Sequence, residues 1–199
     1  MKLEKFELLD ENFDEYLKER NIEVVESSFY LTRSDVEGTI VDPGGVYLPR
    51  SFEGYIFNRR DFDILRENYA HEKSHGAFFE NIDLGKDISR IDREIWEMEK
   101  NVFGKFAESQ KFFQSGEETR LRGTKNGLPV FEIEEEKFEA YKGKVDELYE
   151  KISDNWNFIE AFAMHVSEDY LGELNLGRYP KKYKVAYEEE RKDIEEILK

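Results

Sequence analysis

Two of the three histidines in the chain lie four residues apart, in the segment ENYAHEKSHGAFFE at positions 67 to 80. On a helix, which turns by about 100° per residue, His71 and His75 lie about 40° apart, so both imidazoles can bind one metal ion. Glu72 lies about 80° from the centre of that pair, where its carboxylate can contact a water molecule on the ion. This is the pattern that metal-activated hydrolysis requires.

The alternative interpretation is that the two histidines share a helix by coincidence. Because the chain has only three histidines, a chance His-Glu-x-x-His is rare, and we favour the metal site. Lys73 is unusual, since such motifs prefer uncharged residues between the two ligands. It lies about 180° from the direction of the ion, so it could reach solvent if that side of the helix is not fully buried.

A catalytic zinc ion takes three protein ligands and keeps one position for water. The metzincin pattern would place glycine and histidine where the chain has Phe78 and Asn81, so that class is excluded. Glu160 and His165 are the candidates for the third ligand in a later segment. They lie about 140° apart on a helix, so they cannot both bind the same ion. Glu160 shares its face with small and apolar residues, where a carboxylate is rare unless a cation pairs with it. We therefore predict Glu160 as the third ligand.

Two alternatives for the third ligand stay open. One is His165, for which a packed or surface position is the favoured interpretation. The other is an acid near Glu80 and Asp83, close to the first motif in the sequence. Either would complete a site that is short of one ligand.

The run Ile159-Glu160-Ala161-Phe162-Ala163 resembles the Asn-Glu-Gly-Phe-Ala run of gluzincin metallopeptidases, a superclass that includes aminopeptidase N and thermolysin. In these enzymes a glutamate on a second helix completes the zinc site. Ile159 and Ala161 replace the asparagine and glycine of that run, and Met164 stands where thermolysin has an acid. The segment VDPGGVYLP is also similar in layout to small archaeal gluzincins.

The resemblance implies Zn²⁺ bound by His71, His75 and Glu160, with Glu72 as the general base. It also implies a single zincin-like domain over residues 1 to 199. The two motifs lie farther apart than in the aminopeptidases, so we interpret residues 84 to 153 as an insertion that could wall or cap the cleft. This insertion would contain a long helix, a hairpin and a further helix.

The pattern of apolar residues predicts an α+β fold, with a small N-terminal β-sheet, an active-site helix and a mostly helical remainder. Asn58 or Asp61 can cap the active-site helix, and Asn126-Gly127 predicts a β-hairpin. The other predicted elements are helices over 3–19, 86–114, 135–173 (broken near Ser153-Asp154 and stopped by Gly177 and Pro180) and 183–198, and β-rich runs over 22–33, 37–43 and 45–49 with a turn at 42–45.

Composition limits the classes of function. The formal charge of −16 repels phosphate backbones, which argues against a nucleic-acid partner. The chain has no cysteine, so disulfides and thiolate metal sites are excluded. It has no long apolar run and a charged N-terminus, so we predict a cytoplasmic protein with no membrane partner. Charged residues make up 38% of the chain, as is common in proteins from hot environments.

The sequence thus predicts a zinc metallopeptidase that hydrolyses a peptide or protein substrate through a zinc-bound water. The strand at Gly45 to Leu48 could bind an extended substrate along its edge. Tyr179, Tyr183 and Tyr187 are candidates for stabilising the oxyanion. The alternatives are an inactive or latent zincin-like binding or regulatory protein, and an acidic helical interaction protein without metal.

Overall fold

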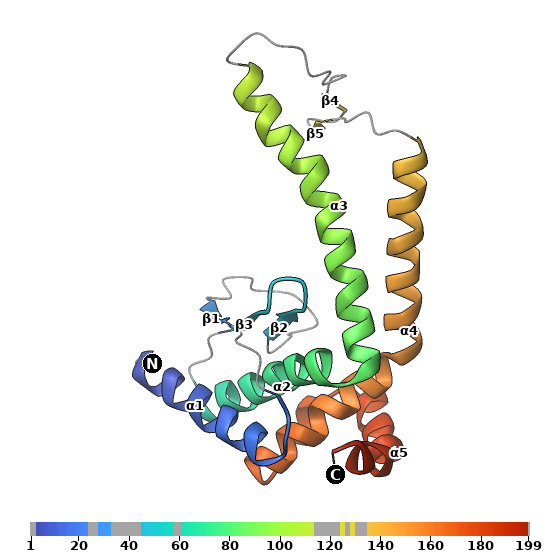
Figure 1. The fold of residues 1–199 in the computed structure, drawn as a ribbon. Helices are drawn as coiled ribbons and strands as arrows, with labels where there is room; N and C mark the ends of the chain where they lie inside the picture. The colour runs from blue at the N-terminus through green and yellow to red at the C-terminus, as the bar shows by residue number, and fades with distance from the viewer. Residues whose placement is uncertain are drawn as a thin grey trace. The chain divides into compact units, whose positions relative to one another are not determined.

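A computed structural model describes residues 3–23, 28–32, 45–57, 61–113, 124–125, 128–129 and 135–198. The fold is α+β and mostly helical, with a small three-stranded sheet, as predicted (Figure 1). The chain divides into two compact units, residues 1–89 with 152–199 and residues 90–151. The elements are α1 (Leu3–Glu19), β1 (Ser28–Thr32), β2 (Gly45–Leu48), β3 (Glu53–Phe57), α2 (Phe62–Asn81), α3 (Asp83–Phe113), β4 (Thr124–Lys125), β5 (Leu128–Pro129), α4 (Glu135–Leu171), the 3₁₀ helix η1 (Leu176–Arg178) and α5 (Lys181–Ile197).

The sheet of the first unit has the order β1-β3-β2, with β1 parallel and β2 antiparallel to the central strand β3. The sequence did not predict β3, because the run is short and Gly54 interrupts its apolar pattern. Gly54 is needed there, since a Cβ atom at this position would lie 2.1 Å from Cε1 of Phe29. The predicted run 37–43 and the turn residues 42–44 lie outside the described residues.

Helix α2 lies at the centre of the first unit and carries the His-Glu-x-x-His motif (Figure 1). It begins as predicted after Asp61, whose carboxylate accepts hydrogen bonds from the main-chain N–H groups of Asp63 at 2.9 Å and Ile64 at 3.4 Å. This cap satisfies donors that a helix start leaves without partners. The helix packs against β2 and β3. Gly76 permits this contact, since a Cβ atom there would lie 3.0 Å from Cε2 of Tyr47.

Helix α4 is continuous from Glu135 to Leu171, so the predicted break near Ser153-Asp154 is wrong. Both residues are exposed, where a helix interior accepts short polar side chains at little cost. The helix ends before Gly172, which has a φ of 85° and whose N–H donates to the carbonyl of Glu168 at 2.8 Å. A glycine in this left-handed conformation is a common helix end, and it precedes the predicted stop signals.

Small side chains bring α2 and α4 close together inside the first unit. The Oγ atoms of Ser74 on α2 and Ser167 on α4 lie 3.2 Å apart. Each hydroxyl also donates to a carbonyl of its own helix, at 2.6 Å, so neither polar group is unpaired in the core. Phe78 and Phe162 pack edge to face beside this crossing, with ring centroids 5.3 Å apart. The crossing therefore places the two halves of the predicted site opposite each other.

Lys73 does not reach solvent, because the side of α2 on which it lies is buried. It is only 5% exposed, because α1 covers the face of α2 that points away from the histidines. Its ammonium group forms ion pairs with Asp10 and with Asp14, the second at 2.5 Å. Tyr69 donates a hydrogen bond to the same Asp10 carboxylate. The ion pairs of Lys73 therefore hold α1 against α2.

Replacing Lys73 by methionine should destabilise the first unit. The substitution keeps the apolar stem but leaves two carboxylates at a partly buried contact without a cation. We expect a loss of about 2 kcal/mol in the free energy of unfolding, less than for a fully buried pair because Asp10 is partly exposed. Urea unfolding measures it. The matched control Lys142→Met removes the exposed Lys142–Asp146 pair, 3.6 Å long, and should leave the unfolding midpoint unchanged; equal midpoints for both variants would contradict this account.

The second unit contains α3 from residue 90 onward, β4, β5 and the first part of α4. Strand β4 pairs with β5 in antiparallel orientation, as the hairpin prediction requires, although the turn at Asn126-Gly127 lies outside the described residues. Lys144 on α4 forms an ion pair with Glu94 on α3, with Nζ and Oε2 2.8 Å apart. That residues 84 to 153 are an insertion into one zincin-like domain stays a prediction.

Candidate metal centre

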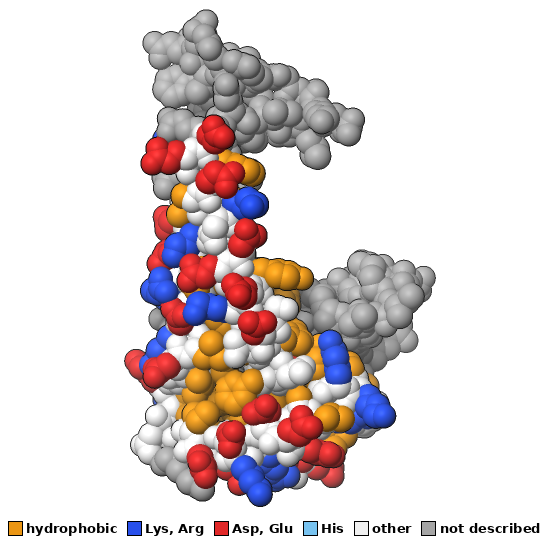
Figure 2. All heavy atoms as spheres, turned by 90° about the vertical axis from the view of Figure 1, so that its right-hand side faces the viewer, with side chains coloured by type: hydrophobic (Ala, Val, Ile, Leu, Met, Phe, Trp, Pro, Cys, Tyr) orange, Lys and Arg blue, Asp and Glu red, His pale blue; other side chains and the backbone are white. Residues whose placement is uncertain are grey.

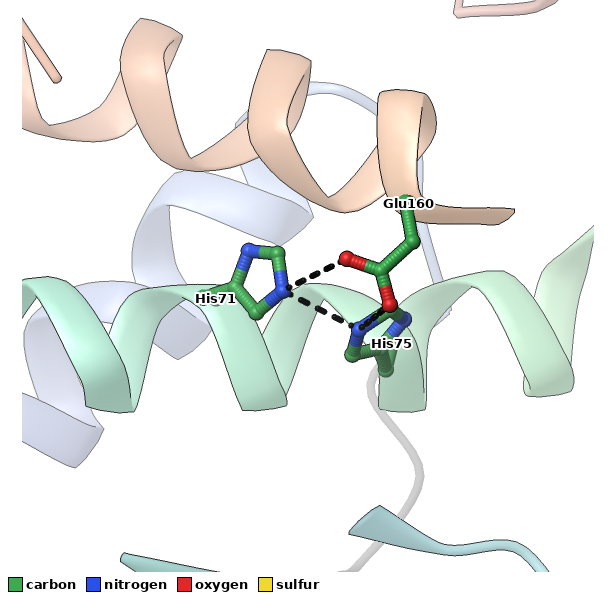
Figure 3. Close-up of side chains that lie close together, drawn as sticks. All are labelled: His71, His75 and Glu160. Carbon is green, nitrogen blue, oxygen red and sulfur yellow. Dashed lines mark hydrogen bonds and ion pairs between the residues drawn. The ribbon is translucent and has the colours of Figure 1, made fainter. Parts of the chain in front are cut away.

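Three side chains from two helices converge in the first unit (Figure 3). His71 and His75 come from α2, and Glu160 comes from α4. The Nε2 atoms of the two histidines lie 3.2 Å apart. Oε2 of Glu160 lies 3.4 Å from Nε2 of His71, and Oε1 lies 3.7 Å from Nε2 of His75. The structure therefore brings together the three residues predicted as ligands.

The spacing of these atoms suits a small divalent cation. Four ligands at the corners of a tetrahedron, each about 2.0 to 2.1 Å from zinc, are separated from one another by about 3.3 Å. The three separations of 3.2, 3.4 and 3.7 Å are close to that value. The two imidazole rings are nearly perpendicular, at 83°. Their Nε2 atoms and the carboxylate of Glu160 point toward one another (Figure 3). Two histidines and one carboxylate are also a common ligand set of catalytic zinc.

The site is almost closed to solvent, and burial changes the proton affinities of its groups. His75 is 8% exposed and Glu160 is 7% exposed. Burial, and then the charge of His71, lower the pKa of His75 to about 4. Burial also lowers the pKa of His71, but its hydrogen bond to Glu160 and the neighbouring carboxylates outweigh this, so its pKa is raised. Burial alone would raise the pKa of Glu160, but the two histidines hold it below its ordinary value.

Glu72 lies against strand β2. It is 6% exposed, and the main chain of Tyr47 on β2 hydrogen-bonds its carboxylate. Gly45 makes room for it, since a Cβ atom there would lie 2.6 Å from Cγ of Glu72. Burial raises the pKa of Glu72 to about 7, with a further contribution from Glu160. A carboxylate with a pKa near neutrality can both accept and release a proton.

A second group of polar residues surrounds His71. The ring centroid of Tyr179, after η1, lies 5.5 Å from that of His71, and Tyr179 also hydrogen-bonds Glu67, one helical turn before His71. Arg178 forms an ion pair with Glu67 at 3.2 Å and donates to Oδ1 of Asn68 at 2.9 Å. The sequence singled out Tyr179 but not Glu67 or Arg178. The position of Glu67 four residues before His71 was the signal that could have found it.

The other predicted candidates do not join the cluster. His165 is buried elsewhere on α4, with its ring centroid 6.3 Å from that of Tyr187. Burial, and then the charge of Arg191, lower its pKa. Among the described residues, the His71, His75 and Glu160 group is the one set of three that could hold a metal ion, so neither His165, Glu80 nor Asp83 supplies a ligand in it.

The hydrogen bonding of the two histidine rings differs from that in most metal sites. A histidine ligand usually donates its second ring N–H to a carboxylate or carbonyl, which fixes the ring. The Nδ1 atoms of His71 and His75 are buried and have no hydrogen-bond partner among the described residues. Met164, at the position of thermolysin's supporting acid, is fully buried. The residues present therefore fit zinc in their direct contacts, without this second hydrogen bond.

Comparison with known proteins adds no family. No protein-family model matches the chain, and neither a curated protein nor a solved structure matches it. In the part of the chain that the structure describes, no helix has both the length and the apolar character needed to cross a membrane.

Proposed function

We propose that the chain is a zinc-dependent metallopeptidase in which His71, His75 and Glu160 hold the ion and Glu72 is the general base. The observation that carries this proposal is the separation of the three ligand groups, 3.2 to 3.7 Å, in a site with a second carboxylate, that of Glu72, beside it. The resemblance of the two motifs to those of gluzincins supports it. Its substrate would be a peptide or protein of the cytoplasm.

The chemistry divides between the ion and Glu72. Zinc held by this ligand set would lower the pKa of a water molecule to about 7 and polarise the carbonyl of the scissile bond. Glu72 would take a proton from the attacking water and pass it to the leaving amine. Its raised pKa, about 7, suits both steps because the group must be a base first and an acid afterwards. The main chain of Tyr47 and the space left by Gly45 hold its carboxylate in place.

Strand β2 is the element on which we propose that the substrate binds. It is at the edge of the described sheet and pairs on one side with β3. An extended peptide can add to such an edge through main-chain hydrogen bonds. The same strand contacts Glu72 through Tyr47, so a peptide bound along it would pass close to the general base.

Tyr179 is the tyrosine that we propose as the oxyanion donor. Of the three candidates, it is the one whose ring lies against that of His71. Its hydroxyl bonds the Glu67 carboxylate in this structure and would turn to the oxyanion when a substrate binds. Burial, followed by the charge of Glu67, raises the pKa of Tyr179, so its hydroxyl stays protonated and can donate. Such a donor would stabilise the negative charge that develops on the carbonyl oxygen during peptide hydrolysis.

Replacing Tyr179 by phenylalanine should lower kcat about 100-fold and leave KM and zinc content nearly unchanged, because the lost donor acts only in the transition state. Steady-state kinetics on a fluorogenic peptide, with zinc quantified by metal analysis, measure both. Tyr149→Phe, at a tyrosine that is 76% exposed, is the matched control. A kcat equal to that of the control would remove Tyr179 from the mechanism.

The function itself is tested by incubating the zinc-loaded protein with an unstructured protein substrate. We expect fragments, identified by mass spectrometry, that disappear with chelator and return with added zinc. A protein that binds zinc stoichiometrically but cleaves no such substrate would instead be the inactive or latent zincin-like protein. The near-complete burial of Glu72, His75 and Glu160 favours that second candidate. A protein that binds no zinc would instead be the acidic helical interaction protein.

A further inference from the structure

The segment next to the candidate metal centre has the opposite charge to the rest of the chain. The chain carries a formal charge of −16, yet residues 174 to 187 contain no aspartate or glutamate. They include Arg178, Lys181, Lys182 and Lys184. Tyr179, in the middle of this segment, lies against His71. A cationic segment therefore borders a site whose own residues are acids and histidines.

Lys182 is the cation of this segment whose contacts lead toward the turn of α4 that carries Glu160. Its Nζ atom lies 4.7 Å from the ring centroid of Tyr183, and Tyr183 accepts a hydrogen bond from Nε1 of Trp156 at 2.9 Å. Trp156 lies one helical turn before Glu160 on α4, in the direction toward which helical side chains lean. The charge of Lys182 also helps to lower the pKa of Glu160. Tyr183 and Trp156 therefore connect the ammonium group to the helical turn that precedes Glu160.

The lysines at the start of α5 are not explained by a stabilising effect on that helix. Lys181, Lys182 and Lys184 lie in its first turn, where the helix dipole disfavours positive charge. No described carboxylate forms an ion pair with Lys182, in contrast to Lys144 and Lys73. Lys182 is exposed, so its ammonium group can accept a partner from solvent.

We propose that Lys182 is a specificity-determining residue that binds a carboxylate of the substrate close to the scissile bond. This inference rests on the proposed peptidase function. The carboxylate is either the C-terminus of a peptide or an aspartate or glutamate side chain, since an ammonium group binds both as a point charge. Trp156, which is 36% exposed, offers apolar surface next to it. Figure 2 shows hydrophobic side chains gathered on the lower part of the side that carries α4 and α5.

Peptide binding tests this assignment without turnover. Labelled peptides are titrated into the zinc-loaded Glu72→Gln variant, and binding is followed by fluorescence anisotropy. One pair of peptides has a free or an amidated C-terminus and no acidic residue. The other pair is amidated and has glutamate or glutamine at one position. We expect the carboxylate form of at least one pair to bind about fivefold more tightly, and the pair that shows the preference identifies the source of the carboxylate.

Lys182→Gln in the same background should abolish the preference, whereas the control Lys192→Gln, farther along α5, should keep it. Zinc affinity is measured separately by competition with a chelator. Equal binding of both forms in both pairs, or a preference that survives Lys182→Gln, would overturn the proposal. So would a change in zinc affinity with no change in preference, because Lys182 would then only screen Glu160. A wild type that shows the preference but cleaves no peptide would refute the peptidase function alone.

Discussion

The Glu72→Gln variant should lose peptide cleavage by about 10³-fold while it keeps one zinc ion per chain. Glutamine has the shape of glutamate but cannot accept the proton of the attacking water. The carboxylate is 6% exposed and beside the ligands, so no bulk solvent base can readily replace it. Measuring kcat/KM together with metal content separates loss of catalysis from loss of the ion.

Glu80→Gln is the matched control for this experiment. It makes the same change on the same helix, outside the cluster of His71, His75 and Glu160. We expect its activity to stay within about twofold of the wild type, as for most substitutions outside a site. A Glu72→Gln variant as active as this control would show that Glu72 is not the base.

Zinc should stabilise the wild-type protein against thermal unfolding, and His75→Ala should remove that effect. An ion that binds only the folded state at 100 times its Kd adds about 2.7 kcal/mol, or roughly 8 °C in Tm for a chain of this size. Removing one of three ligands leaves a site too weak to fill at the same zinc concentration. The difference in Tm with and without zinc, measured by calorimetry, is the relevant quantity.

His165→Ala controls for the loss of a buried imidazole. His165 is 9% exposed and His75 is 8% exposed, so both substitutions remove a similar side chain from the interior. The control should melt at a lower temperature than the wild type but keep the full zinc-induced increase. If His165→Ala lost the increase and His75→Ala kept it, the ion would bind at a different place.

The sequence predicted those parts of the structure that depend on neighbouring residues along the chain. Asp61 caps α2 through hydrogen bonds that span three residues, so its role is visible in a short segment. The common direction of His71 and His75 also follows from the pitch of one helix. That Glu160 would lie opposite them was inferred from a motif and from its apolar face, and it depends on the close crossing at Ser74 and Ser167.

The misses concern contacts between distant segments. Strand β3 forms because β1 and β2 pair with its two edges, which its own short run does not reveal. Lys73 points away from the histidines as predicted, but whether that side meets water or α1 depends on the packing of another helix. Ser153 and Asp154 are residue types that often cap helices, but here both lie inside the continuous helix α4. Arg178 acquires its role only through contact with Glu67.

Anomalous diffraction at the zinc edge, from crystals grown with zinc, tests most directly whether these three side chains bind one ion. We expect a single strong peak at bonding distance from three atoms: Nε2 of His71 and Nε2 of His75 at about 2.0 to 2.1 Å, and the Glu160 carboxylate at about 2.0 to 2.2 Å. Density for zinc at another place, or an empty site at saturating zinc with Glu160 turned away from the histidines, would contradict it.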